Sequence, residues 1–170
     1  MKKLWGFLFL GVMVWSGAVN AKGPELIGEY DDWTAYSYRD GKGVVCYMAS
    51  TPKKDEGKYS KRGDIYVTIT HRPGEKSFDV VNFVAGYTYK NGSNVTVKIG
   101  KDVFGRFFTD GDKAWGVDDK ADRELVAAMK RGQRMIVDGV SSKGTVTKDT
   151  YSLKGFTGAY KAISSKCKKK

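Results

Sequence analysis

The sequence contains few of the residues that most often perform chemistry in proteins. Its 170 residues include two cysteines, three prolines and one histidine, His71. A structural zinc site needs four ligands, usually cysteine and histidine, and this set is too small for one. No Gly-x-Ser-x-Gly segment occurs, so nothing marks a serine nucleophile on a sharp strand-to-helix turn. We therefore expect no catalytic residue, no metal and no cofactor.

Carboxylates are more plentiful, but their spacing does not indicate a metal site. One acid-rich segment contains Asp110, Asp112, Asp118, Asp119 and Asp122. They lack the spacing and the closing glutamate of an EF-hand calcium loop. Their positions are typical of turns and helix caps.

Long apolar runs are equally scarce, because only the N-terminus has one. Lys2 and Lys3 precede an apolar stretch over residues 4–19, and small residues follow at Val19 and Ala21, the positions that signal peptidase reads. This order is typical of a secretory signal peptide, and the stretch is too short and too rich in glycine for a typical membrane span. We predict a signal peptide over residues 1–21, one exported domain over residues 22–170 and no transmembrane span after cleavage. An uncleaved N-terminal anchor is the alternative.

The two cysteines, Cys46 and Cys167, lie far apart in the sequence. In an exported protein, two such cysteines predict one disulfide bond. Closing a loop of about 120 residues would stabilise the fold by up to about 5 kcal/mol in the chain-entropy model. An oxidised Cys46 carries no thiolate, so a nucleophilic pair with His71 is disfavoured.

Short segments of alternating polarity indicate β-structure. Residues 65–70, IYVTIT, have the period of two that is typical of a half-buried strand. Residues 118–131 begin with acids and end with bases before Gly132, which predicts a helix, and residues 155–165 predict a second. The predicted strands are residues 33–38, 44–50, 65–70, 78–87, 95–99, 103–108, 113–117, 135–140 and 145–152. This order indicates a mainly-β, single-domain antiparallel β-sandwich with two short helices, one near the C-terminus.

His71 and the tripeptide Arg62-Gly63-Asp64 each have a functional and a structural interpretation. His71 ends a predicted strand before a Pro-Gly turn, which favours a structural or surface role over a general acid or base. A periplasmic enzyme or chaperone-like factor with a cleft near His71 is the alternative. Arg62-Gly63-Asp64 is a sequence that host integrins recognise, but its place directly before a predicted strand favours a turn.

The aromatic residues also leave two interpretations open. Trp33, Trp115 and the many tyrosines could form a platform on which sugar rings stack. More often such side chains belong to the core or the rim of a sheet. The sequence alone does not place them.

The chain is strongly basic. Its 30 lysines and arginines outnumber 19 acids, for a formal net charge of +11, which favours anionic surfaces such as acidic lipid or glycan. Residues 52–62 and the C-terminal tail are both basic and follow the two cysteines, so a disulfide would bring their starts together. We predict one basic patch made of Lys53, Lys54, Lys58, Lys61, Arg62, Lys168, Lys169 and Lys170. A solvated lysine-rich face is the alternative, and nucleic acid is disfavoured as a partner because the chain is exported and has no recognition motif.

Several segments are distinctive in combination. They are DDWTAYSY, VVCYMASTPKK, KRGDIYVTITHRP, GDKAWGVDD, the long run from ELVAAMKRGQRMIVDG to GFTGAYKAI, and the terminal cysteine. On these segments, in order over nearly all of the predicted mature chain, the sequence resembles the invasion-associated locus B family of exported alphaproteobacterial proteins. The resemblance implies a β-sandwich-like domain in which Cys46 and Cys167 are paired. It implies no catalytic residues, because the family has no established catalytic motif.

The expected protein is a non-enzymatic envelope component of a Gram-negative bacterium. The resemblance implies that it is periplasmic, secreted or associated with the outer surface. The family is named for a member linked to bacterial invasion of host erythrocytes, so the expected role is support of host-cell association. The expected partner is an envelope or host-surface molecule, such as an anionic lipid or glycan, bound by the basic patch. A purely structural envelope component is the other alternative.

Overall fold

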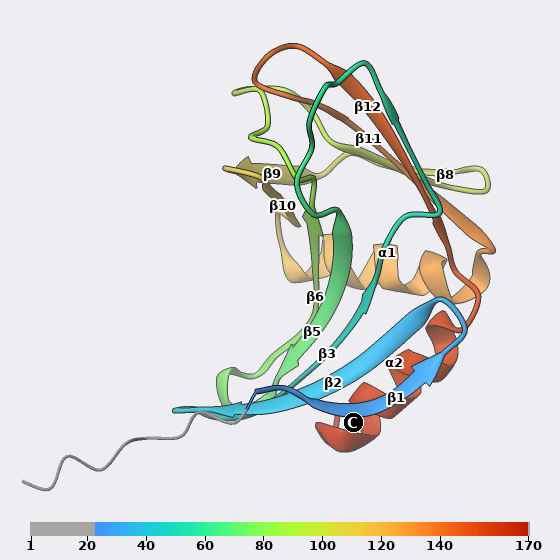
Figure 1. The fold of residues 1–170 in the computed structure, drawn as a ribbon. Helices are drawn as coiled ribbons and strands as arrows, with labels where there is room; N and C mark the ends of the chain where they lie inside the picture. The colour runs from blue at the N-terminus through green and yellow to red at the C-terminus, as the bar shows by residue number, and fades with distance from the viewer. Residues whose placement is uncertain (1–22, 170) are drawn as a thin grey trace, which may run out of the picture.

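The computed structural model describes residues 23–169, so the predicted signal peptide and Lys170 lie outside the described part of the chain. Within this part the structure is mainly β, with twelve strands and two α-helices (Figure 1). No helix among these residues is long and apolar enough to cross a membrane. The elements are, in chain order, β1 (Glu25–Tyr30), β2 (Trp33–Asp40), β3 (Gly43–Ser50), β4 (Lys54–Gly57), β5 (Tyr66–Arg72), the short 3₁₀ turn η1 (Pro73–Glu75), β6 (Ser77–Val84), β7 (Thr96–Ile99), β8 (Asp102–Phe104), β9 (Phe107–Asp110), β10 (Lys113–Gly116), α1 (Asp119–Arg131), β11 (Arg134–Val140), β12 (Val146–Ser152) and α2 (Phe156–Lys166).

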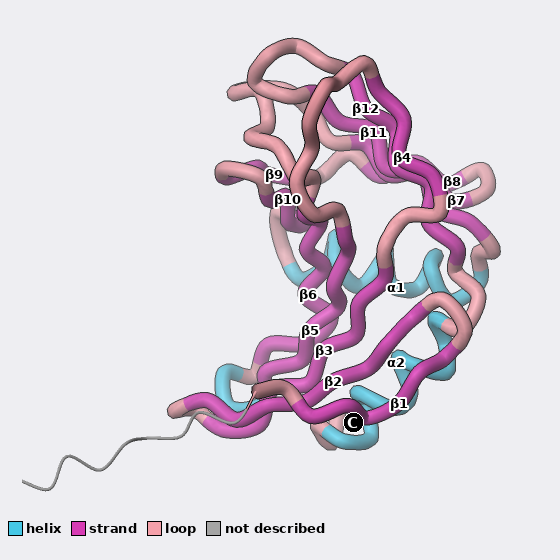
Figure 2. Tube along the Cα trace, in the orientation of Figure 1, coloured by secondary structure: helices cyan, strands magenta, loops and turns pink. Residues whose placement is uncertain are grey.

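The strands form two antiparallel sheets (Figure 2). The large sheet has the order β1-β2-β3-β5-β6-β10-β9, and the small sheet has the order β4-β12-β11-β7-β8. Both sheets and both helices contribute to one hydrophobic core. The predicted fold class is therefore confirmed: the domain is a mainly-β, antiparallel β-sandwich with two helices, one of them near the C-terminus.

Both helices pack on the same face of the large sheet. α2 contacts β1, β2 and β3, and α1 contacts β6 and β10. On the four central strands Ala35, Met48, Ile69 and Val81 lie side by side, and each is 0% exposed. The alternation of side chains along a strand puts these residues on one face and their neighbours on the other.

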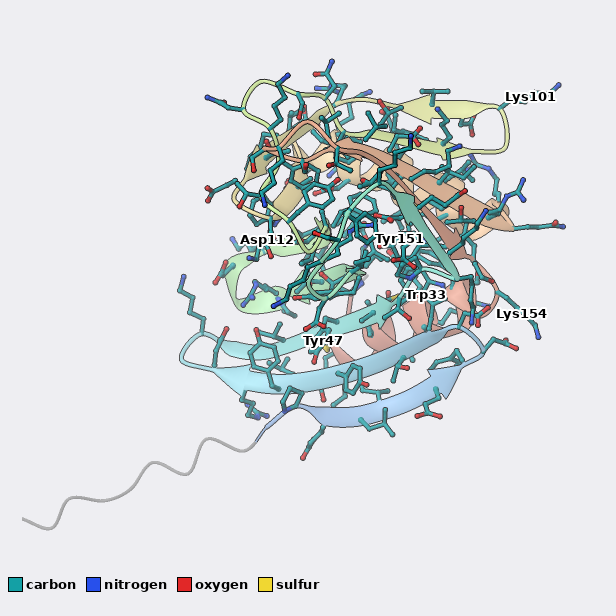
Figure 3. The ribbon with its side chains drawn as sticks, turned by 45° about the horizontal axis from the view of Figure 1, so that its top comes forward. Trp33, Tyr47, Lys101, Asp112, Tyr151 and Lys154 are labelled. Atoms are coloured by element: carbon teal, nitrogen blue, oxygen red, sulfur yellow. A yellow bond between two sulfur atoms is a disulfide. The ribbon has the colours of Figure 1, made fainter. Side chains whose placement is uncertain are left out.

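Trp33 links the two sheets to α2. Its indole N–H donates to the carbonyl oxygen of Ser152 at 3.0 Å, and its ring meets the edge of Phe156 at 4.9 Å between centroids. Trp33 and Tyr151 are both 1% exposed, and Figure 3 places them in the interior between the sheets. Burying an aromatic ring of this size is among the largest single contributions to a core.

α1 forms where the sequence predicts it. Asp118 caps its N-terminus, with the carboxylate accepting from the backbone N–H of Ala121 at 2.7 Å. Gly132 ends the helix as predicted, but at φ −82° it is not the left-handed cap that favours glycine. A Cβ at this position would lie 2.4 Å from Ile99 and 2.9 Å from Leu153. Glycine is required because the helix ends in close contact with the small sheet.

Candidate functional site

The predicted disulfide is present. Cys46 on β3 and Cys167 at the end of α2 are bonded, with a Cα–Cα distance of 6.0 Å. The two residues are 0% and 2% exposed, and no free cysteine occurs in the chain. The bond holds the C-terminal helix on the large sheet, so Cys46 is a structural residue.

His71 lies beside Cys46 on the neighbouring strand and is fully buried. Its Nδ1 accepts from the backbone N–H of Asp79 at 3.1 Å, and its Nε2 lies 3.2 Å from the hydroxyl of Ser164 on α2. Because Nδ1 is an acceptor, the neutral ring carries its proton on Nε2 and donates to Ser164. Burial lowers the pKa of His71 to about 4, so the ring is uncharged at neutral pH.

Next to this histidine, Asp79 accepts hydrogen bonds from two side chains of the C-terminal segment. The Tyr160 hydroxyl donates at 2.6 Å, and the Lys169 ammonium donates to the other carboxylate oxygen. Burial by itself would raise the pKa of Asp79, but the bonds from Lys169 and Tyr160 outweigh it and hold the pKa below its usual value. Lys169 is therefore engaged within the fold, with a side chain that is 21% exposed.

Arg62 does not belong to a surface patch. Its guanidinium makes two hydrogen bonds to Asp149 of β12, at 2.7 and 2.6 Å, and a third to the carbonyl oxygen of Ala85 at 2.7 Å. The side chains of Arg62 and Asp149 are only 3% and 6% exposed. The prediction that Arg62 contacts a partner is wrong, because a carboxylate facing the interior of the small sheet requires a buried cation.

The same burial changes the interpretation of Arg62-Gly63-Asp64. An integrin ligand displays its arginine and aspartate on either side of an exposed turn, whereas this arginine points inward. The backbone N–H of Gly63 donates to the carbonyl oxygen of Gly86 at 2.8 Å. The tripeptide is thus a segment before β5 that is held to the rest of the fold by hydrogen bonds, and its arginine is not displayed to an integrin.

The predicted single basic patch does not form. β3 carries the chain away from Cys46, and β4 then pairs with β12 in the small sheet, whereas the tail leaves from Cys167 beside α2. Figure 2 accordingly places β4 far from the C-terminus. One group is on or near the small sheet, Lys53, Lys54, Lys58 and Lys61, and all four are exposed. The other group is Lys168, which is exposed, and Lys169, while Lys170 lies outside the described residues.

A basic groove that the sequence analysis does not predict lies elsewhere. It has a volume of about 940 Å³ and lies between the β7–β8 turn, the end of α1 and the start of β11. Its lining contains one acid, Asp102, and four exposed cations, Lys98, Lys101, Arg131 and Arg134. We call these four residues the groove cations.

The groove cations differ in how far they are already neutralised. Lys98 pairs with Asp138 at 2.6 Å, and Arg131 lies 4.0 Å from Asp102. Among the described residues, Lys101 and Arg134 have no carboxylate within 4.0 Å. Lys101 and Arg134 are therefore the cations that are available to an anionic partner.

Local sequence explains how the groove is built. Gly100 has φ +60° and allows the tight β7–β8 turn, which carries Lys101. Gly132 allows α1 to end against β7, so that the bases around it face the turn. The only sequence signals are two short segments, IGKD and KRGQR, and nothing local indicates that they meet.

Asp122 is a buried acid rather than the turn or cap residue that its position suggests. It lies on α1, is 5% exposed, and its Oδ1 has no hydrogen-bond partner in the described part of the chain. Burial raises the pKa of Asp122 to about 6. Between about pH 4 and pH 6 the Asp122 carboxyl is protonated in the native state and ionised in the unfolded chain. The free energy of unfolding therefore falls as pH rises through this range.

Replacing Asp122 with asparagine should therefore stabilise the protein in a pH-dependent way. Relative to wild type, the gain in the free energy of unfolding should be near zero at about pH 4 and reach about 3 kcal/mol above about pH 6. Urea denaturation across this range measures the difference, and the exposed neighbour Asp119→Asn is the matched control. A gain that does not change with pH would contradict the buried position of this carboxyl.

These features define a class of protein: a disulfide-bonded, two-sheet β domain. Its buried histidine and its buried ion pair form hydrogen bonds within the fold. The family model described as invasion associated locus B (IalB) protein matches residues 33–164. The chain therefore belongs to this family, as its sequence motifs predict. No curated protein matches the sequence.

A solved structure shows the same fold. The crystal structure of invasion associated protein B from Bartonella henselae is similar with a TM-score of 0.56 and 17% sequence identity. The match covers 86% of this chain and 98% of that chain. At this identity the comparison concerns the fold alone.

Proposed function

We propose that this protein is an exported, non-enzymatic envelope protein that binds an anionic envelope or host-surface molecule through the groove cations. The observation that carries the proposal is the convergence of four cations from three elements on one groove lined by a single acid. Such a set of charges attracts phosphate or carboxylate groups. Membership of a family named for invasion supports a role at the cell envelope, including host-cell association.

The chemistry of the groove suits phosphate or carboxylate. The planar guanidinium of Arg134 offers paired N–H donors that match either group, and Lys101 adds a mobile point charge. Because these charges are exposed, their attraction for a ligand is screened by salt. Binding should therefore weaken steeply as ionic strength rises.

Two features support a non-enzymatic role. His71 is 0% exposed and hydrogen-bonded on both ring nitrogens, so it lacks the access to substrate that a general acid or base needs. Both cysteines are oxidised, which removes the thiolate that a cysteine nucleophile requires. The buried charges of Arg62 and Asp149 are paired with each other.

The test compares two double variants that remove the same charge from different surfaces. Lys101→Gln/Arg134→Gln should weaken binding to vesicles containing phosphatidylglycerol, or to polygalacturonate, by about tenfold. Lys58→Gln/Lys61→Gln, from the basic loop, should weaken it much less. Co-sedimentation at low and high salt measures both effects, and the two probes separate a lipid source of the anion from a glycan source. Equal losses in the two variants, or binding insensitive to salt, would contradict the proposal.

A further inference from the structure

The large sheet has a second face, opposite the helices, on which aromatic side chains gather. In the described part of the chain no helix or strand lies over this face (Figure 1). Along β2 the residues that face the helices, Trp33 and Ala35, are at most 1% exposed. Tyr36 and Tyr38 point to the opposite face and are partly exposed. Figure 3 likewise places Tyr47 on the large sheet, away from the interior position of Trp33.

Two aromatic clusters stand on this face. In the first, the rings of Tyr36 and Tyr47 stack at 5.2 Å between centroids, and Tyr38 meets Tyr47 edge-on at 6.2 Å. In the second, Phe108 and Trp115 stack at 5.3 Å. The first cluster is on β2 and β3 and the second on β9 and β10, so Tyr47 and Trp115 are three strand spacings apart, about 14 Å across the sheet. Their rows are also offset by two residues along the strands.

An uncharged floor joins the two clusters. The strand register places Thr70 and Val80 in line with Tyr47, and Thr68 and Asn82 in line with Trp115. These four floor side chains are partly exposed and none carries a charge. The face therefore combines exposed rings with hydroxyl and amide groups.

Among the described residues, charged groups lie only at the border of this face, and its cations are already paired. Arg72 donates to Asp40 at 3.1 Å and to the Tyr38 hydroxyl at 3.2 Å. Lys113 pairs with Asp112 at 2.7 Å beyond the second cluster. The register also places two exposed carboxylates at the border, Glu29 opposite Thr34 and Asp110 opposite Lys113. In a chain with a formal net charge of +11, an uncharged aromatic face bordered by acids is poorly suited to the anionic partner of the groove.

We propose that this aromatic face binds a neutral stretch of a glycan chain. A pyranose ring with equatorial substituents has flat C–H faces that stack on aromatic rings, as other apolar surfaces do, and edge hydroxyls that pair with threonine and asparagine. The two clusters are three strand spacings apart and offset along an open sheet, an arrangement that suits an extended polymer running obliquely over the strands. This site lies on the opposite face of the large sheet from α1, whose C-terminal end forms part of the basic groove, and it needs no charge on the ligand.

Intrinsic fluorescence tests the proposal directly. The predicted mature chain has two tryptophans, Trp33, which is 1% exposed, and Trp115, which is partly exposed on the aromatic face. Titration with chitohexaose or cellohexaose should shift the emission of Trp115 to the blue and protect it from acrylamide quenching. The response should be unaffected by salt and should persist in Lys101→Gln/Arg134→Gln. Absence of binding to both oligosaccharides in the wild-type protein would overturn the proposal.

Variants then locate the contact. Tyr47→Ala should weaken oligosaccharide binding about tenfold, whereas Tyr59→Ala, an aromatic residue beside the small sheet, should leave it unchanged. Trp115→Phe should lose the fluorescence response but keep binding that calorimetry detects. Thermal unfolding confirms that each variant is folded. Unchanged affinity in folded Tyr47→Ala, or capture of a protein ligand that neither oligosaccharide displaces, would overturn the glycan assignment.

Discussion

Replacing Arg62 with methionine should lower the free energy of unfolding by about 3–5 kcal/mol, because the carboxylate of Asp149 would be left buried without a cation. The loss should exceed that of an ordinary surface arginine, since Arg62 also bonds the carbonyl oxygen of Ala85 and lies against Tyr87, with 5.0 Å between its guanidinium carbon and the ring centroid. Urea denaturation at neutral pH measures it. The neighbouring exposed lysine, Lys61→Met, is the matched control and should change the stability by less than about 0.5 kcal/mol.

A double variant distinguishes the cost of an unpaired buried carboxylate from the cost of losing the arginine side chain itself. In Arg62→Met/Asp149→Leu both charges are gone, so much of the stability lost in the single variant should return. A single variant as stable as wild type would show that Arg62 is not buried in solution, and it would restore this residue to the candidates for partner contact.

Removing the disulfide should have the second large effect. Cys46→Ser/Cys167→Ser should lower the free energy of unfolding by about 2–5 kcal/mol, because the bond closes a loop between residues 121 positions apart. Reductant should lower the denaturation midpoint of the wild-type protein to that of the double variant. It should leave the midpoint of the double variant unchanged. Two titratable thiols in the native, unreduced protein would contradict the structure.

The disulfide variant should also loosen the C-terminal segment. Cys167 anchors the end of α2, and Lys169 reaches Asp79 only from that position. We therefore expect faster hydrogen exchange at residues 164–169 in the variant than in wild type. Exchange in β11 should change little, since it lies in the small sheet.

Much of the fold follows from local sequence signals. The alternation in residues 65–70 and the charge order of residues 118–131 predict β5 and α1 closely, because burial of one face and the helix dipole act locally. β1 has no such signal: it is an edge strand with little buried surface. β4, with the sequence KDEG, is a strand only because β12 offers it a pairing edge.

One predicted strand is divided between the two sheets. Residues 103–108 read as one segment, but β8 pairs with β7 in the small sheet and β9 pairs with β10 in the large sheet. The change of sheet occurs at Gly105 and Arg106. A local pattern cannot indicate it, because the choice of sheet depends on partners that are distant in the sequence.

The positions of the site residues also depend on partners that are distant in the sequence. The pairing of Cys46 with Cys167 follows from the sequence, because an N-terminal stretch predicts export and each cysteine has one possible partner. The charge of Arg62 gave no indication of its burial, since only the fold places Asp149 opposite it. The groove was missed because Lys101 and Arg134 meet through the register of β7 on β11, although each stands in a visibly basic segment.

Backbone NMR shift mapping tests most directly whether an anionic partner binds at the basic groove. Titration of the isotope-labelled domain, residues 22–170, with glycerol phosphate and with a carboxylated oligosaccharide should shift amide signals in residues 98–102 and 131–134, and added salt should reverse the shifts. If the largest shifts fall in residues 52–61 or 166–169, or if no described residue shifts, the partner does not bind at the groove.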